Sequence, residues 1–200
     1  MRELIMILDY VGTFAFAVTG ASVAAKSDYD VFGMVFLAFL TAVGGGTVRD
    51  IILGLPVFWT VSSVSLYIIL GATFLTLFFQ MFFKKIRSVI FFCDTLGLGI
   101  FAIIGSQKAL TLNTNIETAL IMGMITGVLG GVLRSVFSNE VPIIFKKEIY
   151  ATTAAISSAI FVCLYKLDIS YYVNVAATIT SCMLIRYCSV RFNFHLPKAR

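Results

Sequence analysis

Seven long runs of apolar residues, separated by short polar segments, follow one another along the chain. Each run approaches or exceeds the roughly 20 residues that an α-helix needs to cross the hydrocarbon core of a bilayer. The segments between them are rich in the lysine, aspartate, asparagine and proline residues that are typical of loops. The pattern predicts an all-α integral membrane protein with seven transmembrane helices, at about residues 5–25, 31–55, 61–83, 88–110, 116–137, 148–166 and 170–190.

The first three runs are related to the next three by an internal repeat. One constant shift along the chain, the one that carries Asp9 onto Asp94, aligns identical residues without a gap. Glycines, acids and arginines rarely recur by chance in apolar helices. Because each copy holds an odd number of spans, the second copy must enter the membrane from the opposite side, so the halves are predicted to be inverted. The predicted units are residues 1–87 and 88–167, followed by a seventh helix and basic tail at 168–200. The aligned identities are Asp9 with Asp94, Gly12 with Gly97, Phe16 with Phe101, Ala17 with Ala102, Gly20 with Gly105, Thr41 with Thr126, Val43 with Val128, Gly45 with Gly130, Gly46 with Gly131 and Arg49 with Arg134.

Composition places the function inside the helical bundle. Of the 200 residues, 60% are hydrophobic and 12% are charged, whereas soluble domains carry about 25% charged residues. The net charge of +5 is explained by membrane topology rather than by nucleic-acid binding. No nucleotide-binding loop, metal-ligand cluster or catalytic triad is visible in the sequence, which indicates neither an enzyme nor a cofactor or metal site.

The distribution of basic residues predicts the orientation. With seven spans, eleven basic residues fall on the side of the C-terminus and four on the other. The positive-inside rule then predicts a protein of the cell inner (plasma) membrane with its N-terminus outside and its C-terminus in the cytoplasm. Two of the eleven, Lys146 and Lys147, could also contact anionic lipid. The eleven are Lys26, Lys84, Lys85, Arg87, Arg134, Lys146, Lys147, Arg186, Arg191, Lys198 and Arg200, and the four are Arg2, Arg49, Lys108 and Lys166.

Glycine clusters occur at matching places in the second helix of each half. The first is Gly44, Gly45 and Gly46, and the second is Gly130 and Gly131. Each glycine weakens a helix by about 1 kcal/mol relative to alanine, so a bend or break is expected at both places. Paired breaks in two inverted halves are typical of a transport site, because freed carbonyls and amides must meet water or protein. The alternative is a purely structural role, since small residues let helices approach closely.

Charged and hydroxyl side chains lie next to these clusters. Arg49 and Arg134 follow three residues after the glycines, where a guanidinium needs a partner or water, or else reaches toward the membrane interface. Asp50 follows Arg49, but Ser135 stands at the equivalent position of the second half. A preceding pair of threonines completes this set of candidate pore-lining or gating residues: Thr41 and Thr126.

Two aspartates lie near the predicted starts of the first helix of each half. Asp9 and Asp94 could simply be favoured there by the positive end of the helix dipole. Equally, they could line an aqueous vestibule, because acids within the membrane are costly and usually functional. Both interpretations are open at this point.

Several of these motifs resemble a known family. The runs Gly44–Asp50 and Gly130–Arg134, the segment Glu140–Pro142 and the segment Lys147–Thr152 resemble the prokaryotic branch of the trimeric intracellular cation (TRIC) channels. The resemblance covers nearly the whole chain and implies a homotrimer in which each subunit has its own pore. It further implies second helices kinked at their glycine clusters and potassium as the main permeant ion. Two departures from the family pattern are Leu129, where a third glycine is expected, and Ser135, where an acid is expected.

Two functions fit these features. A channel for monovalent cations would use backbone carbonyls exposed at the bends, helped by Asp9, Asp94 and Asp50, to replace the ion's hydration. Unpaired arginines would repel cations, so they must be paired or act as movable gates. A carrier of a small solute such as glycine is the alternative, because inverted repeats with broken helices are equally typical of carriers.

Overall fold

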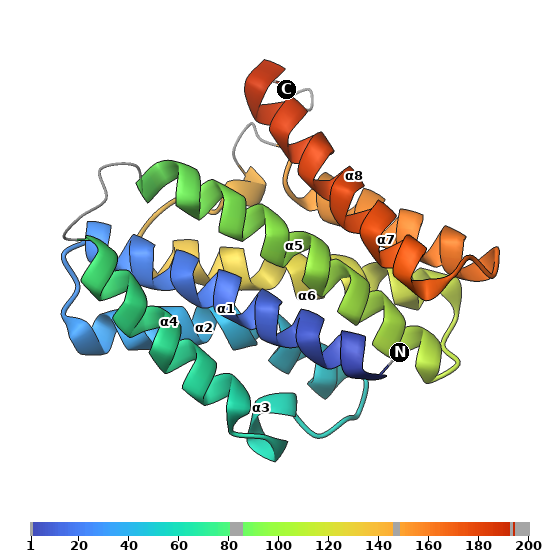
Figure 1. The fold of residues 1–200 in the computed structure, drawn as a ribbon, viewed down its shortest axis with the longest axis horizontal. Coiled ribbons are helices and arrows are strands. Elements are labelled where there is room, and N and C mark those ends of the chain that lie inside the picture. Colours follow the sequence, from blue (N-terminus) through green and yellow to red (C-terminus); the bar gives the residue numbers. More distant parts are fainter. Residues whose placement is uncertain (1, 81–85, 146–148, 193, 195–200) are drawn as a thin grey trace.

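The computed structural model describes residues 2–80, 86–145, 149–192 and 194, and within them it is all-helical (Figure 1). Each predicted apolar run contains one long helix. The two short helical segments, α3 and η1, lie in loops where none was predicted. The helices are α1 (Arg2–Lys26), α2 (Val31–Ile52), α3 (Phe58–Val61), α4 (Val64–Gln80), α5 (Ile86–Thr111), α6 (Ile116–Phe137), the 3-10 helix η1 (Ile143–Phe145), α7 (Ala151–Lys166) and α8 (Tyr171–Phe192).

Helix length and hydropathy confirm an integral membrane protein. Among the described residues, 5 helices are long and apolar enough to cross a membrane, namely α1, α2, α5, α6 and α8. The third helix of each half is shorter, with 17 residues in α4 and 16 in α7. The seven-span count therefore stays a prediction for these two helices.

Four helices form the centre of the bundle. α1 packs against α2 and α5, and α6 also packs against α2 and α5. α4 packs on α1 and α2, whereas α7 packs on α5 and α6, so each half places its third helix on its own flank of the centre. α8 lies outside this arrangement, against α5 and α7 (Figure 1).

The glycine clusters lie where α2 and α6 cross. A methyl group on Gly45 would overlap the backbone carbonyl of Thr126, and a methyl group on Gly130 would overlap that of Thr41. The contacts are reciprocal, with each helix presenting a glycine to a carbonyl of the other. Only glycine permits backbones to approach this closely, and such small-residue contacts are a common basis of helix association in membranes.

The predicted break at the glycine clusters is wrong. Both α2 and α6 continue as α-helix through Gly44–Gly46 and through Gly130–Gly131. Gly45 and Gly130 pack against the opposite helix, Gly46 against Phe58 and Gly131 against Tyr150. This packing compensates the weak helix propensity of glycine, because tertiary contacts routinely override propensity. The alternative, a bend without a break, stays a prediction, and the hinge role of these glycines belongs to the proposed function.

The crossing of α1 and α5 follows the same reciprocal pattern. The ring of Phe101 lies against Gly12, and the ring of Phe16 lies against Gly97. The two rings also contact each other, with centroids 5.1 Å apart. Each aromatic residue thus fills the space left by a glycine of the other half.

The helix ends correspond as well. α2 begins after the N-cap Asp30 and α6 after the N-cap Asn115, and both side chains accept a hydrogen bond from the amide three residues on. Past the ends of the same helices, Gly54 and Asn139 adopt positive φ values of 67° and 55°. These conformations favour glycine and asparagine. Each pair is separated by the same shift that carries Asp9 onto Asp94, as duplication of one structural unit would produce.

We predict that Gly45→Ala destabilises the protein by about 2–3 kcal/mol, since the added methyl group meets rigid backbone of α6 rather than a movable side chain. Thermal unfolding of the purified protein in detergent measures the effect. Gly71→Ala in α4 is the matched control, because no atom beyond its own chain neighbours and helix backbone lies within 4 Å of the added methyl group and alanine favours the helix. Equal stability of the two variants would contradict the close crossing.

Candidate functional site

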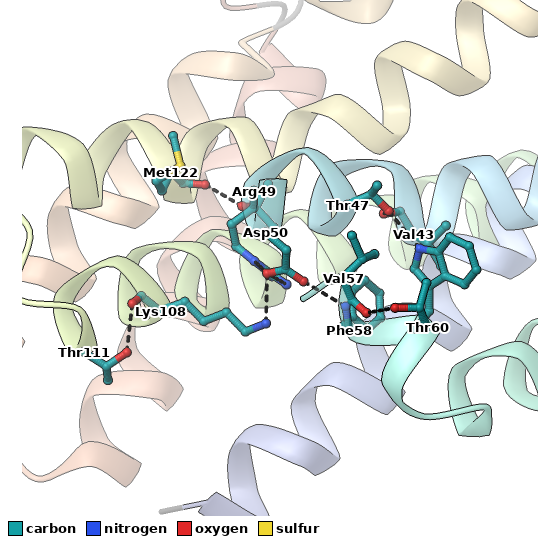
Figure 2. A network of polar contacts seen from close by, with 12 residues as sticks. Val43, Thr47, Arg49, Asp50, Val57, Phe58, Thr60, Lys108, Thr111 and Met122 are labelled. Atoms are coloured by element: carbon teal, nitrogen blue, oxygen red, sulfur yellow. Dashed lines mark hydrogen bonds and ion pairs between the residues drawn. The ribbon is translucent and has the colours of Figure 1, made fainter. Parts of the chain in front are cut away.

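The first buried charge cluster surrounds Asp50 at the end of α2 (Figure 2). Arg49 donates a hydrogen bond of 2.8 Å from Nε to Oδ1 of Asp50. Nη2 of Arg49 lies 2.8 Å from the same oxygen as an ion pair, and Nζ of Lys108 in α5 lies 3.0 Å from it. The other carboxylate oxygen, Oδ2, accepts a hydrogen bond of 3.0 Å from the backbone amide of Phe58. Asp50 is fully buried and Arg49 is 1% exposed, whereas Lys108 is 32% exposed and reaches the surface.

The short helix α3 covers the first cluster with an aromatic ring. The Phe58 ring centroid lies 5.7 Å from the Arg49 guanidinium and 5.9 Å from the Lys108 ammonium. Both are cation–π distances. The half-buried Asp9 of α1 lies within electrostatic range of Arg49 and Lys108. The first cluster therefore comprises Asp9, Arg49, Asp50, Phe58 and Lys108, and holds two cations and two carboxylates.

The second buried charge cluster joins α6 to α5 and α1. Nη1 of Arg134 lies 2.8 Å from Oδ1 of Asp94, and both side chains are 3% exposed. The same Nη1 donates a hydrogen bond of 2.7 Å to the hydroxyl oxygen of Thr19. This ion pair is sealed more completely than the first cluster, because both of its members are buried.

An aromatic and cationic layer lies behind this ion pair. Tyr150, at the start of α7, is 1% exposed and its hydroxyl faces Gly131 of α6. The guanidinium of Arg186 in α8 lies 4.9 Å from the Tyr150 ring centroid and 5.3 Å from that of Phe91. The second cluster is defined as Thr19, Asp94, Arg134, Tyr150 and Arg186.

The two clusters lie on opposite sides of the helix crossing. α5 contributes Asp94 to one and Lys108 to the other, and at 1.5 Å per residue these positions are about 21 Å apart along the helix. The reciprocal glycine–carbonyl contacts of Gly45 and Gly130 lie on the segments of α2 and α6 between them. We call the closely packed crossing of α2 and α6 around Gly45 and Gly130 the neck. A charge cluster lies at each end of it.

The positions of the charged residues contradict two of the interpretations drawn from the sequence. The helix-start interpretation of the aspartates is wrong, because α1 begins at Arg2 and α5 at Ile86, so Asp9 and Asp94 lie in helix interiors. The interface-reaching interpretation of the arginines is also wrong, because both side chains are buried and paired within the bundle.

Ser135 does not replace the acid missing from the second half. Its hydroxyl donates to the carbonyl of Gly131 in its own helix, at 3.1 Å, and takes no part in the ion pair. Arg134 instead pairs with Asp94, so the second half uses the aspartate of α5 where the first half uses Asp50. Lys146 and Lys147, the predicted lipid contacts, lie outside the described residues.

Sequence reasoning missed part of each cluster. Lys108 and Arg186 stand inside predicted apolar runs, and a charge within such a run is the signal in the sequence that could have found them. Leaving out these two and the buried Arg49 and Arg134 reduces the eleven-to-four split to nine against two, which keeps its direction. Thr19, Phe58 and Tyr150 carry no comparable signal, since neutral residues of these types are common in apolar helices and loops.

The described residues contain no group of three or more histidine, cysteine, aspartate or glutamate side chains placed to hold a metal ion. The groups that the described site residues offer are paired buried charges, aromatic rings and backbone carbonyls along a crossing of two helices.

A family model described as "Glycine transporter" matches the chain twice, over residues 6–81 and 91–166. The second match is displaced from the first, at its start and at its end, by the shift that carries Asp9 onto Asp94. The same model thus describes both halves of the chain.

Several bacterial membrane proteins are similar over nearly the full length. A UPF0126 membrane protein of Vibrio cholerae is 36% identical over 98% of this chain and 82% of its own length. The UPF0126 inner membrane protein YadS of Escherichia coli K12 is 34% identical over 97% of this chain and 95% of its own length. The UPF0126 membrane protein YvgT of Bacillus subtilis is 33% identical, with 96% and 94% covered.

Solved structures are similar to the chain in both fold and sequence. The TRIC trimeric intracellular cation channel orthologue from Rhodobacter sphaeroides superimposes with a TM-score of 0.91 at 33% identity, covering 96% of this chain and 99% of that one. A prokaryotic TRIC channel crystallised in 0.5 M KCl gives a TM-score of 0.90 at 29% identity, covering 98% and 100%. The chain therefore belongs to the prokaryotic TRIC-type family of membrane proteins, whose family model carries the description "Glycine transporter".

Proposed function

We propose that the protein is a channel for monovalent cations, chiefly potassium, with a pore in each subunit along the crossing of α2 and α6. The observation that carries the proposal is the similarity to the Rhodobacter sphaeroides TRIC cation channel orthologue, at a TM-score of 0.91 over 96% of the chain. A match of this extent at 33% identity includes the segments that form the central helices.

The neck between α2 and α6 supplies oxygen ligands for a cation. The carbonyls of Thr41 and Thr126 point at glycines of the opposite helix. Separation of the two helices, together with local loosening of their own helical hydrogen bonds, would let these carbonyls replace ion hydration. In the conformation described here the neck is closed, because Gly45 and Gly130 occupy the space in front of these carbonyls. Conduction therefore requires bending or displacement of α2 or α6, for which the glycine clusters are the proposed hinges.

The two charge clusters act as gates in series on either side of the neck. Each arginine is neutralised by a carboxylate, Arg49 by Asp50 and Arg134 by Asp94, so neither presents an uncompensated positive charge to a cation. Opening at either end would exchange an arginine–carboxylate contact for an ion–carboxylate contact.

The assembly and placement follow from the same comparison and from charge. We propose a homotrimer in the cell inner membrane, with seven spans, two inverted three-helix repeats and a cytoplasmic C-terminus. The recurrence of N-caps, positive-φ positions and glycine contacts at one constant shift along the chain supports the repeats. Anionic lipid at Lys146 and Lys147 is part of this proposal.

A carrier for glycine is the second candidate. It is favoured by the family model, which is described as "Glycine transporter" and matches both halves. Closed charge clusters on both sides of a neck also suit alternating access, in which one end opens while the other stays shut.

Reconstitution into planar bilayers distinguishes the two. We predict single-channel currents in potassium chloride that reverse near the potassium equilibrium potential and are unaffected by glycine, because the paired charges leave carbonyl and carboxylate oxygens as ligands. Parallel flux measurements in liposomes with potassium, sodium, chloride and labelled glycine provide the comparison. Saturable glycine exchange without conductance would reject the channel in favour of the carrier.

The ion pair of the second cluster gives a sharper test. Asp94→Asn leaves the buried Arg134 uncompensated, so we expect a loss of stability of about 3–5 kcal/mol and at least a tenfold loss of potassium current. The double variant Asp94→Asn with Arg134→Gln removes both charges and should regain most of the stability and part of the current.

The control for this test is Ser135→Ala, because among the described residues that hydroxyl donates its hydrogen bond to Gly131 of its own helix. It should behave as the wild type in both currents and thermal unfolding. Wild-type currents in Asp94→Asn would show that this pair does not control the pore.

A further inference from the structure

α8 lies outside the internal repeat but contacts the neighbourhood of both charge clusters. Near its start, the Tyr171 hydroxyl donates a hydrogen bond of 2.5 Å to Oε1 of Gln107, the residue before Lys108 of the first cluster. Four turns later on the same helix, Arg186 belongs to the second cluster. α8 therefore spans the distance between the clusters as one rigid element, about 22 Å at 1.5 Å per residue.

Arg186 is buried rather than placed at a membrane surface. The residue is 2% exposed, and its guanidinium lies over the rings of Tyr150 at 4.9 Å and Phe91 at 5.3 Å. A desolvated guanidinium over an aromatic face is strongly attracted to it. A basic residue that served topology alone would not be enclosed in this way.

Tyr150 lies between Arg186 of α8 and Gly131 of α6. Its ring is held under the guanidinium of α8, and a methyl group added to Gly131 would lie 2.5 Å from its hydroxyl oxygen. Gly131 precedes Arg134 by less than one helical turn. The tyrosine is thus a wedge between α8 and the last turns of α6, which carry the Arg134–Asp94 ion pair.

We propose that the stack of Arg186 on Tyr150 is a latch through which α8 holds the end of α6 and its Arg134–Asp94 pair in the closed arrangement. Arg186 is then a positioning residue that sets how often the second gate opens, without contacting the permeating ion. The inference rests on the proposed channel function, and it gives the seventh helix a regulatory role that the repeat alone lacks.

The test compares Arg186→Met with Arg191→Met, a matched variant at an exposed position of the same helix. In planar bilayers, Arg186→Met should raise the open probability on the order of tenfold, the size expected for loss of a desolvated cation–π contact. The unitary conductance should stay unchanged, and Arg191→Met should match the wild type. An unchanged open probability in Arg186→Met would overturn the latch, as would a changed unitary conductance.

Variants of Tyr150 test the same contact from the other side. Tyr150→Phe keeps the ring and should retain most of the latch, whereas Tyr150→Leu should open as often as Arg186→Met. In the double variant Arg186→Met with Tyr150→Leu, the two effects should not add, since both remove one interaction. Full additivity would mean that the two residues act separately and would reject the latch. Arg186→Lys keeps the charge and should lie between the wild type and Arg186→Met.

A second readout does not depend on current. Cysteine introduced as Ser135→Cys lies beside Arg134 at a buried position, and its labelling by a water-soluble maleimide in liposomes reports opening of this end. Labelling, measured relative to the same protein with Ser135, should accelerate in the Arg186→Met background and not in the Arg191→Met background. Absence of wild-type current would reject the proposed channel, whereas equal labelling in the two backgrounds would reject the latch. Thermal unfolding identifies any variant that fails to fold, and Arg186→Lys then carries the comparison.

Discussion

The close contact between the backbones of α2 and α6 is the constraint on which the remaining structure depends. Glycine in each helix faces a carbonyl oxygen of the other, at Gly45 with Thr126 and at Gly130 with Thr41. This contact joins the two halves of the chain at the bundle centre. It therefore fixes how far the next turns of α2 and α6 extend beyond the crossing. Arg49 and Arg134, each about one turn further on, are thereby directed to opposite ends of the neck.

The two ends correspond in sequence but differ in chemistry. At the first, one carboxylate receives Arg49 and Lys108 together, and the lysine reaches the surface. At the second, Asp94 and Arg134 form a sealed pair, and the buried Arg186 adds a second cation nearby. Ser135, standing where Asp50 stands in the first half, made this difference necessary, because a neutral hydroxyl cannot compensate a buried guanidinium. The two gates of the proposed channel are therefore expected to respond to different conditions.

α8 breaks the symmetry further. α8 follows the two segments that the family model matches, and it packs on the side of the second half, against α5 and α7. Its attachment through Tyr171 near one cluster and Arg186 at the other gives the bundle a mechanical connection between its ends that depends on neither α2 nor α6. In the channel proposed above, this connection is the route by which α8 would hold the second gate closed.

The amino-acid sequence was sufficient to predict the membrane class and the positions of the helical runs, and it carries the identities at one constant shift on which the predicted repeat rests. These follow from hydropathy over about 20 residues and from identities at a constant shift, both of which are local or pairwise properties of the chain. How the glycines are used and which charges meet became visible only in three dimensions. Gly44–Gly46 remain helical although glycine weakens a helix, with α6 packed against Gly44 and Gly45 and Phe58 against Gly46. Arg134 pairs with Asp94 of another helix rather than with a neighbour in the chain. Lys108 and Arg186 belong to the clusters because a buried charge pairs with the group that helix packing brings near it. The spacing of residues along one helix does not determine how that helix packs against others.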